Sequence, residues 1–192
     1  MEQMKSINHI EMYTALFKDW VPKESELLTC KPLLYLRDSR PSFDVIISEN
    51  FGYDFFQFFG YHLQTPVINF HTTMPFPWQY DQTGLPSNPS YIPHLFAEGL
   101  PPRLSFEQRL KNTFYYLYIC YLYKTRSEAA YDEIAKKFFA KAMPPLAEVV
   151  KNASLMFTST HVSFNRARPI VPNVVEVAGL SIFPPKALPQ VS

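Results

Sequence analysis

The sequence predicts an α/β fold built on an open, mostly parallel sheet with flanking helices. Short β-branched segments alternate with helical segments along the chain, which is the pattern of parallel sheets with crossover helices. The clearest unit is a strand over 43–48 (FDVIIS), a helix over 53–63 (YDFFQFFGYHL) and a second strand over 66–70 (PVINF). Together these segments make a strand, helix, strand crossover of about thirty residues.

The first strand of this unit is a continuous apolar run. It follows the breaker 39–41 (SRP) and precedes Glu49 and Asn50. An uninterrupted run of that length is typical of a strand covered on both faces, as in parallel sheets. In the following helix, Gly60 lowers the helix propensity. We still expect a helix there because the apolar residues recur at helical spacing.

Capping, periodicity and proline signals predict the other elements. Ser105 and Gln108 form a capping box that starts an aromatic-rich helix over 106–124. Segment 74–103 is rich in proline and has no period, which is typical of a binding loop or an ordered lid. The remaining predictions are a helix over 10–20 followed by a polar connection, helices over 127–140 and 146–152, and strands over 155–160 and 173–177.

Composition and charge exclude several classes of protein. A hydrophobic fraction of 47% is too high for a disordered chain, and a net charge of +1 gives no footprint for nucleic acid. Segment 1–19 has no apolar core of a signal peptide. The longest apolar run, 114–123, is half of the ~20 residues that span a membrane. The 18 prolines are scattered, which favours fixed loop corners over a low-complexity tract.

Few motifs with a known chemistry occur. The sequence has no phosphate-binding glycine loop, zinc-protease helix, nucleophile elbow or CxxC pair. Its five histidines occur singly, so we expect no metal site. Cys30 and Cys120, ninety positions apart, are expected to be buried thiols. Asn152 begins the one glycosylation sequon, Asn-Ala-Ser.

The candidate site lies where the two strands of the crossover end. Ligands of parallel sheets bind outside the carboxyl ends of the strands, here at Glu49 and Asn50 and at residues 71–73 (HTT). A carboxylate at Glu49 can hold and charge-balance a histidine base, or it can be an ordinary loop or N-cap carboxylate. Asp54 opens the following helix, where its charge suits the helix dipole. The helix over 106–124 fits the core better than a membrane surface, because few cations flank its aromatic residues.

Five segments resemble, in this order, the amino-terminal domain of animal UDP-glycosyltransferases, especially the insect-type members. The match runs from about residue 43 to 182, and NPSYIP (88–93) and RPIVPNVVEVAGL (168–180) are its most specific parts. The five segments are FDVIISENFGYDFF, TPVINFHTTMPFPW, LPSNPSYIPHLF, LSFEQRLKNTFYYLY and RARPIVPNVVEVAGLSI.

The resemblance implies an inverting enzyme of the GT-B fold, with two Rossmann-like domains that bind a lipophilic acceptor and a UDP-sugar. It implies a helical lead-in over 1–42, a partial acceptor-binding domain over 43–182 and the start of an interdomain linker over 183–192. Glu49 matches the acidic partner of the family's histidine base, where many relatives have Asp. His9 lies in a predicted helix, so we do not assign it the role of the base.

We therefore expect a piece of a UDP-glycosyltransferase that transfers a hexosyl or glucuronosyl group to a small lipophilic hydroxyl compound. The chain alone is expected to be inactive, with the UDP-sugar bound by a carboxyl-terminal domain. Full-length relatives are expected at the lumenal side of the endoplasmic reticulum membrane. The alternatives are a non-catalytic module that binds a lipophile or regulates a full-length relative, and an unproductive truncation. The protein partners considered are a second copy of the chain, in a homo-oligomer, and a full-length relative. Expected acceptor-lining residues are Phe51, Tyr53, His71, Thr72, Met74 and Trp78.

Overall fold

A computed structural model of the chain describes residues 9–94, 103–165, 167–180 and 182–183. The described strands form one sheet in the order β1-β2-β3-β4. All neighbouring strands run parallel, which confirms the predicted α/β sheet. The strands are β1 Ile46–Glu49, β2 Val67–His71, β3 Leu155–Thr158 and β4 Val174–Glu176.

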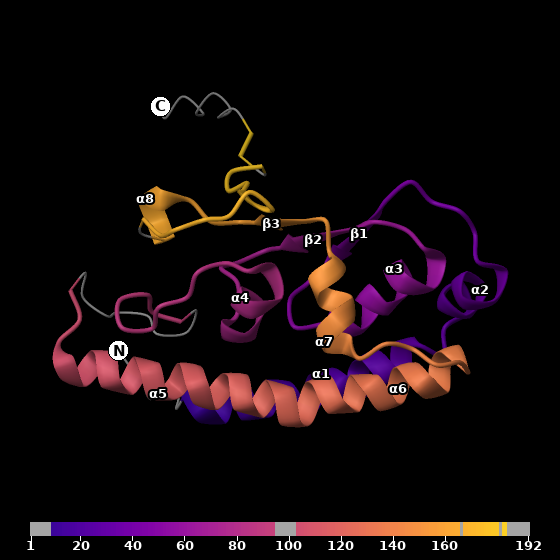
Figure 1. Cartoon of the computed structure of the whole chain (residues 1–192), viewed down its shortest axis with the longest axis horizontal. Coiled ribbons are helices and arrows are strands. Elements are labelled where there is room, and N and C mark those ends of the chain that lie inside the picture. Colours follow the sequence, from indigo (N-terminus) through magenta and orange to yellow (C-terminus); the bar gives the residue numbers. More distant parts are fainter. Residues whose placement is uncertain (1–8, 95–102, 166, 181, 184–192) are drawn as a thin grey trace, which may run out of the picture.

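Helices pack against this sheet in two layers. The helical elements are α1 His9–Leu27, α2 Lys31–Ser39, η1 Asp54–Phe56, α3 Gln57–Leu63, α4 Pro77–Thr83, α5 Phe106–Leu122, η2 Tyr123–Glu128, α6 Ala129–Phe139, α7 Leu146–Val149, η3 Val150–Asn152 and α8 Val162–Asn165. Figure 1 shows α3, α4 and α7 beneath the sheet, and beyond them α1 with the long rod of α5 and α6. The core therefore lies between the sheet and this rod.

The crossover from β1 to β2 explains why a glycine occupies the middle of its helix. A Cβ at Gly60 would lie 2.2 Å from Cγ2 of Val67 and 3.3 Å from the carbonyl oxygen of Thr65. Any side chain would push α3 away from β2. Glycine lowers the helix propensity at this position, but its lack of a Cβ allows the helix to pack closely on the strand. The helix ends at Gln64, whose φ of 56° is left-handed.

The first strand differs from its prediction in position and in burial. It begins at Ile46 rather than Phe43, and Glu49 is its last residue rather than the residue after it. It forms an edge of the sheet, and Ile47 is 67% exposed. The prediction that both faces are covered is therefore wrong for this strand. A β-branched run has the same appearance at an edge and in the centre of a sheet, which is the reason for the error.

The amino-terminal part is more helical than predicted. α1 continues through Pro22 to Leu27, and α2 replaces the expected polar connection. A proline at the start of α2 is compatible with a helix because its missing N–H would be unpaired there. Tyr13 and Phe17 of α1 are buried in the core. Most of the expected linker over 183–192 lies outside the described residues.

The two predicted helices over 106–124 and 127–140 are joined into one rod by the π-helix η2. The predicted capping box is confirmed. The Gln108 N–H donates to Oγ of Ser105 at 3.3 Å, and the Ser105 N–H donates to Oε1 of Gln108 at 2.8 Å. The predicted helix over 146–152 and the last two strands are also confirmed, with β3 ending at Thr158.

The proline-rich segment contains a helix that periodicity did not reveal. α4 starts with Pro77 in its first turn and ends at Gly84, whose φ is 71°. The Phe76 N–H donates to Oε1 of Gln79 at 2.8 Å and so closes the start of the helix. A helix of two turns is too short to show a clear period. The end of this segment, 95–102, lies outside the described residues.

Aromatic side chains fill the space between the layers. Phe55 stacks on Phe139 at 6.1 Å between ring centroids. Trp78 lies between Phe76 and Tyr123, at 4.7 and 4.6 Å, with nearly parallel rings. Each large apolar side chain that is fully buried contributes about 1.5–3 kcal/mol. The many Phe and Tyr residues of the sequence therefore serve mainly this core.

Candidate functional site

The carboxyl ends of the four strands meet at one edge of the sheet, as parallel topology requires. Glu49 lies beside Phe70, and His71 lies beside Thr158, which in turn pairs with Glu176. The chain continues from β1 through Asn50, whose N–H donates to the carbonyl of Phe70 at 2.9 Å. Polar side chains from all four strands are thereby brought to this edge.

A cavity of about 450 Å³ opens beside β1 and reaches Glu49. This volume lies in the range of small-molecule sites, roughly 300–1,000 Å³. Among the described residues that line it, Glu49 alone is charged, so the wall is almost entirely apolar. The lining residues are Leu33, Leu36, Phe43, Val45, Ile46, Ile47, Ser48, Glu49, Tyr53, Phe56, Phe59 and Leu63.

The Glu49 carboxylate is free to take a partner. It is exposed, and it makes no hydrogen bond or ion pair with any residue that the structure describes. The sheet register places Glu49 in one row with Phe70, Phe157 and Val175 of the neighbouring strands. An unpaired acid at the border of an apolar cavity can accept a hydrogen bond from a hydroxyl, or stabilise a cation that approaches the cavity.

The structure separates the predicted lining residues into three places. Tyr53 joins Glu49 in the cavity. Phe51, His71 and Phe76 form one aromatic cluster, with ring centroids 5.2 Å apart for Phe51 and Phe76, 5.6 Å for His71 and Phe76, and 6.4 Å for Phe51 and His71. Phe51 and His71 therefore lie close to the end of β1 but do not line the cavity.

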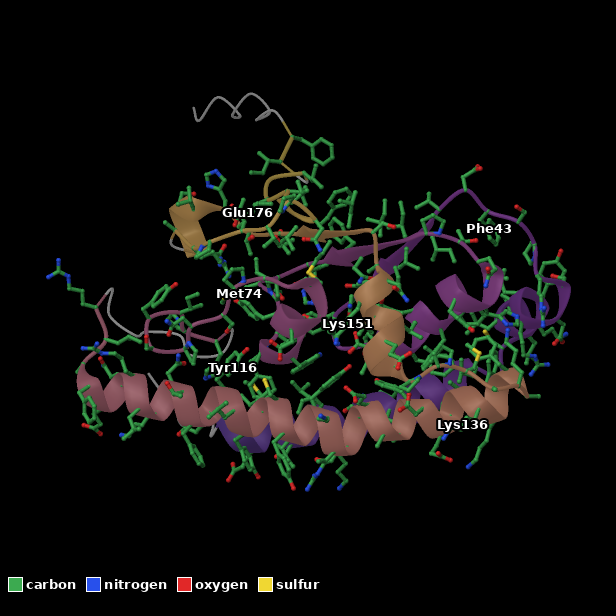
Figure 2. The ribbon with its side chains drawn as sticks, viewed as in Figure 1. Phe43, Met74, Tyr116, Lys136, Lys151 and Glu176 are labelled. Atoms are coloured by element: carbon green, nitrogen blue, oxygen red, sulfur yellow. The ribbon has the colours of Figure 1, made fainter. Side chains whose placement is uncertain are left out.

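The other predicted lining residues do not line the cavity. Thr72 is exposed and Met74 is half-buried, both after the end of β2. Figure 2 shows Met74 well apart from Phe43, which marks the rim of the cavity. Trp78 is buried in the aromatic stack. Geometry therefore supports Tyr53 as a lining residue beside Glu49, whereas Trp78 has the contacts of a core residue.

His71 is a neutral side chain at ordinary pH. It is completely buried at the end of β2. Burial lowers the pKa of His71 to about 4, and a contact with Gln79 offsets only part of that effect. An imidazole held in this way donates or accepts hydrogen bonds but does not carry charge at pH 7.

A buried amide connects the two loops at this edge and was not predicted. Nε2 of Gln79 donates to the backbone oxygen of Asn50 at 3.2 Å and to its Oδ1 at 3.0 Å, while Oε1 accepts the N–H of Phe76. Gln79 therefore ties the loop after β1 to the loop after β2. The sequence pattern placed Asn50 with Glu49 at the end of the first strand, but no periodic signal marks Gln79.

Asp54 has a different environment from the one predicted. It opens the helical turn η1, but it is fully buried and accepts a hydrogen bond from the Tyr123 hydroxyl. Burial raises the pKa of Asp54, and contacts with Tyr123, Asn50 and Gln82 oppose this. The carboxyl is therefore a buried polar contact between η1 and η2 rather than an exposed charge at a helix end.

A further polar group lies at the ends of β3 and β4. The hydroxyls of Thr158 and Thr160 lie 2.8 Å apart, and Thr160 donates to Oε1 of Glu176 at 2.8 Å. Arg168 reaches the hydroxyl of Tyr80 at 3.3 Å. The cavity that Thr158, Thr160, Arg168 and Glu176 line has a volume of only about 10 Å³. These side chains therefore fill the space at the carboxyl ends of β3 and β4 rather than form a binding site.

In the part of the chain that the structure describes, no three His, Cys, Asp or Glu side chains come together in a way that could hold a metal ion. The described helices include none with the length and apolarity needed to cross a membrane. Cys30 and Cys120 are half-buried free thiols.

Comparison with known proteins gives a family match along the whole chain. The profile of a family described as "UDP-glucoronosyl and UDP-glucosyl transferase" matches residues 3–192. UDP-glucosyltransferase 2 of Dactylopius coccus is 36% identical over 82% of this chain and 30% of its own length. UDP-glycosyltransferase UGT5 of the same insect is 34% identical over 84% of this chain and 31% of its own length.

A mammalian relative shows the same partial overlap. UDP-glucuronosyltransferase 1-2 of Rattus norvegicus is 34% identical over 67% of this chain and 24% of its own length. The chain thus spans less than a third of these relatives. No solved structure matches it.

Proposed function

The chain belongs to the family of UDP-glucoronosyl and UDP-glucosyl transferases, and from this premise we propose that it forms the acceptor-binding side of a UDP-glycosyltransferase. Its parallel sheet with flanking helices agrees with a Rossmann-like half of a GT-B fold. The reaction we propose for the whole protein moves a hexosyl or glucuronosyl group from a UDP-sugar to the hydroxyl of a small lipophilic acceptor. The observation that carries the proposal is the apolar cavity that runs along the edge strand β1 and includes Glu49 at the carboxyl end of that strand.

The proposed chemistry assigns two tasks to this chain. In the transfer, the acceptor oxygen loses its proton to a base, bonds to the anomeric carbon, and UDP leaves with the electrons of the broken bond. The cavity would hold the apolar body of the acceptor and exclude water from it. Glu49 would orient a histidine base and stabilise the imidazolium that forms when the base takes the proton. Glu49 is a positioning residue in this proposal.

A second candidate function is lipophile binding without turnover, alone or as a regulatory partner of a full-length relative. One observation favours it: the wall of the cavity is almost entirely apolar, and none of the described residues that line it is a histidine. Proximity of a base is worth many kcal/mol in such reactions. The chain by itself is therefore expected to bind acceptors and to release no UDP.

A titration tests the cavity. The 192-residue chain is titrated with 1-naphthol, a fluorescent lipophilic alcohol, and we expect saturable binding. Ile47→Lys places a charge in the cavity wall at an exposed position, so the fold should survive while affinity falls at least tenfold, about 1.4 kcal/mol. The matched control is Val175→Lys, an exposed apolar residue on β4 that does not line the cavity. Equal affinities for both variants would remove the cavity as the binding site.

An assay of UDP release tests whether the chain alone binds acceptors without turnover. The chain is incubated with a UDP-sugar and 1-naphthol, and free UDP is measured. No release from the chain, combined with binding, supports an acceptor-binding module whose base and donor site lie on other segments. Clear sugar transfer by the 192-residue chain would contradict that division of labour.

We further propose a lumenal location in the endoplasmic reticulum for the whole protein. The support from this chain is Asn152, which is exposed at the end of η3 and begins a glycosylation sequon.

A further inference from the structure

α5 presents an apolar ridge to the outside of the molecule. The ridge consists of Phe106, Leu110, Phe114, Leu117 and Tyr121, each between 59% and 78% exposed. Figure 2 shows side chains along the lower side of the rod pointing away from the other layers, whereas Tyr116 points inward. The Tyr116 hydroxyl donates to the carbonyl of Pro77 at 3.1 Å.

The sequence prediction that this helix belongs to the core therefore holds for one face of the helix and not for the other. Its inner face buries Asn112, Ile119 and Leu122. The ridge lies on a different stripe, where apolar residues recur at intervals of four, four, three and four positions. This spacing keeps side chains on one line along a helix and is the spacing of helix pairs that pack side by side.

Opposite charges mark the two ends of the ridge. Glu107 lies in the first turn of α5 and Lys124 lies just beyond its last turn, both exposed and on the same stripe. The midpoint of the ridge falls between Tyr115 and Tyr116. The pairs at equal distances from this midpoint are Glu107 with Lys124, Leu110 with Tyr121, and Phe114 with Leu117.

We propose that the α5 ridge is a self-association surface, on which a second copy of this chain packs antiparallel across a two-fold axis. Such an axis brings each member of a pair opposite the other member in the second copy. Both ends of the interface then join Glu107 of one copy to Lys124 of the other, and apolar residues meet in between. A parallel copy would instead place like charges together. This inference goes beyond the proposed sugar transfer and does not depend on it.

The size of the ridge predicts a weak dimer. Five large side chains, each more than half exposed, offer several hundred Å² per copy, at the low end of the ~1,200–2,000 Å² that specific interfaces bury in total. A dissociation constant in the micromolar range is therefore expected. The end charges add selectivity for the antiparallel arrangement more than they add affinity.

The experiment measures the mass of the 192-residue chain by sedimentation equilibrium over a series of micromolar concentrations. We expect a monomer–dimer equilibrium. Leu117→Lys, near the axis, places two like charges in the apolar centre and should abolish the dimer. Val162→Lys, at a similarly exposed apolar residue on α8, should leave the dissociation constant unchanged. Circular dichroism verifies that both variants fold.

Charge reversal tests the antiparallel arrangement. Glu107→Lys or Lys124→Glu alone should raise the dissociation constant about fivefold, since two symmetric pairs of up to ~1 kcal/mol become repulsive. The double variant E107K/K124E should restore the original value. Because Glu107 also pairs with Lys111 of its own helix at 2.6 Å, Lys111→Ala controls for the loss of that contact and should change little.

Three outcomes would overturn the proposal. The chain could remain a monomer at every concentration, or dimerise equally well with Leu117→Lys, or show no rescue in the double variant. Flotation with phosphatidylcholine and phosphatidylserine vesicles covers the membrane alternative. Vesicle binding by a monomeric wild type that Leu117→Lys abolishes would assign the ridge to a lipid surface instead.

Discussion

His71 shows how burial alone converts a titratable residue into a neutral structural group. Its ring is packed edge-on against Phe76 at 5.6 Å, and burial lowers its pKa to about 4. In an unfolded chain the same side chain titrates near 6.5. The unfolded state therefore binds more protons between these two values, and the folded state loses stability as the pH falls through that window.

We expect a pH-dependent loss of stability that depends on His71. As the pH falls from about 6.5 to about 4, the folded chain should lose on the order of 3 kcal/mol through this residue, at about 1.4 kcal/mol for each tenfold change in a protonation constant. Urea unfolding at several pH values measures the effect. His71→Asn, which does not titrate there, should show a smaller slope. The pKa of His62 is also lowered, but that residue remains in both proteins and cancels in the difference.

Asp54 contributes with the opposite sign. Because burial raises its folded pKa, its contribution is fully present below the unfolded value near 4 and is lost as the pH rises through the folded pKa. Asp54→Asn keeps the shape and an acceptor for Tyr123 but carries no charge. We expect this variant to gain stability relative to the wild type as the pH rises, which urea unfolding between pH 4 and 8 would show. A constant difference across that range would contradict a buried, titrating carboxyl.

Tyr123 provides the matched test of the same contact. Its pKa lies well above the usual value because of burial and the nearby Asp54, so its hydroxyl remains a donor. Tyr123→Phe should cost about 1–3 kcal/mol, since the buried carboxyl loses its hydroxyl partner. In the double variant D54N/Y123F the cost should differ from the sum of the two single changes, because the two groups act on each other.

The residue-scale environment of Asp54 could not be predicted from the sequence. An acidic residue in a first helical turn favours an exposed charge, and that pattern is local. Its burial depends on Tyr123, which is 69 positions away and belongs to a different helix. The position of Glu49 at the end of β1 was predicted more closely, because the end of a β-branched run can be located from the run itself.

At the scale of single elements, the close contact of α3 with β2 sets a limit on Gly60. Gly60→Ala would gain up to ~1 kcal/mol of helix propensity, but its Cβ would meet Val67, a buried and β-branched neighbour. We expect a net loss of stability of about 1–3 kcal/mol in urea unfolding, as for other overpacked cores.

A second variant distinguishes this contact from a general effect on α3. Val67→Ala removes the methyl group that the new Cβ would meet. The double variant G60A/V67A should therefore lose less stability than the sum of the two single variants. Additive losses would indicate that the contact is not the cause.

The elements that were predicted well are those with long or repeated signals. The capping box at Ser105 and Gln108 and the apolar runs of β2 and β3 specified their elements through local chemistry. The elements that were missed are α2 and α4, which are short and polar or rich in proline. The edge position of β1 was missed for another reason: which strands neighbour it is a property of the whole sheet.

At the scale of the whole molecule, the parallel topology alone predicts where the candidate site lies. Parallel strands joined by crossovers must end at the same edge, so Glu49 and His71 had to lie near one another. The position of the cavity could not be predicted in this way. Its wall includes Leu33 and Leu36 of α2, an element that the sequence did not reveal.

The strand order also separates the proposed binding site from the proposed glycosylation site. Asn152 precedes β3, whereas the cavity runs along β1, and β2 lies between these two strands. Figure 2 shows Lys151, the neighbour of Asn152, apart from Phe43 at the cavity rim. A glycan at Asn152 should therefore leave the cavity open.

This separation predicts that glycosylation and ligand binding are independent. Expressed through a eukaryotic secretory pathway, the chain should carry one glycan that a peptide N-glycosidase removes, and Asn152→Gln should lack it. Glycosylated chain, deglycosylated chain and Asn152→Gln should bind 1-naphthol with the same affinity, because Asn152 precedes β3, two strands away from the cavity-lining β1. A glycan that weakens binding would contradict this separation, and an unmodified Asn152 would remove the support for a lumenal location.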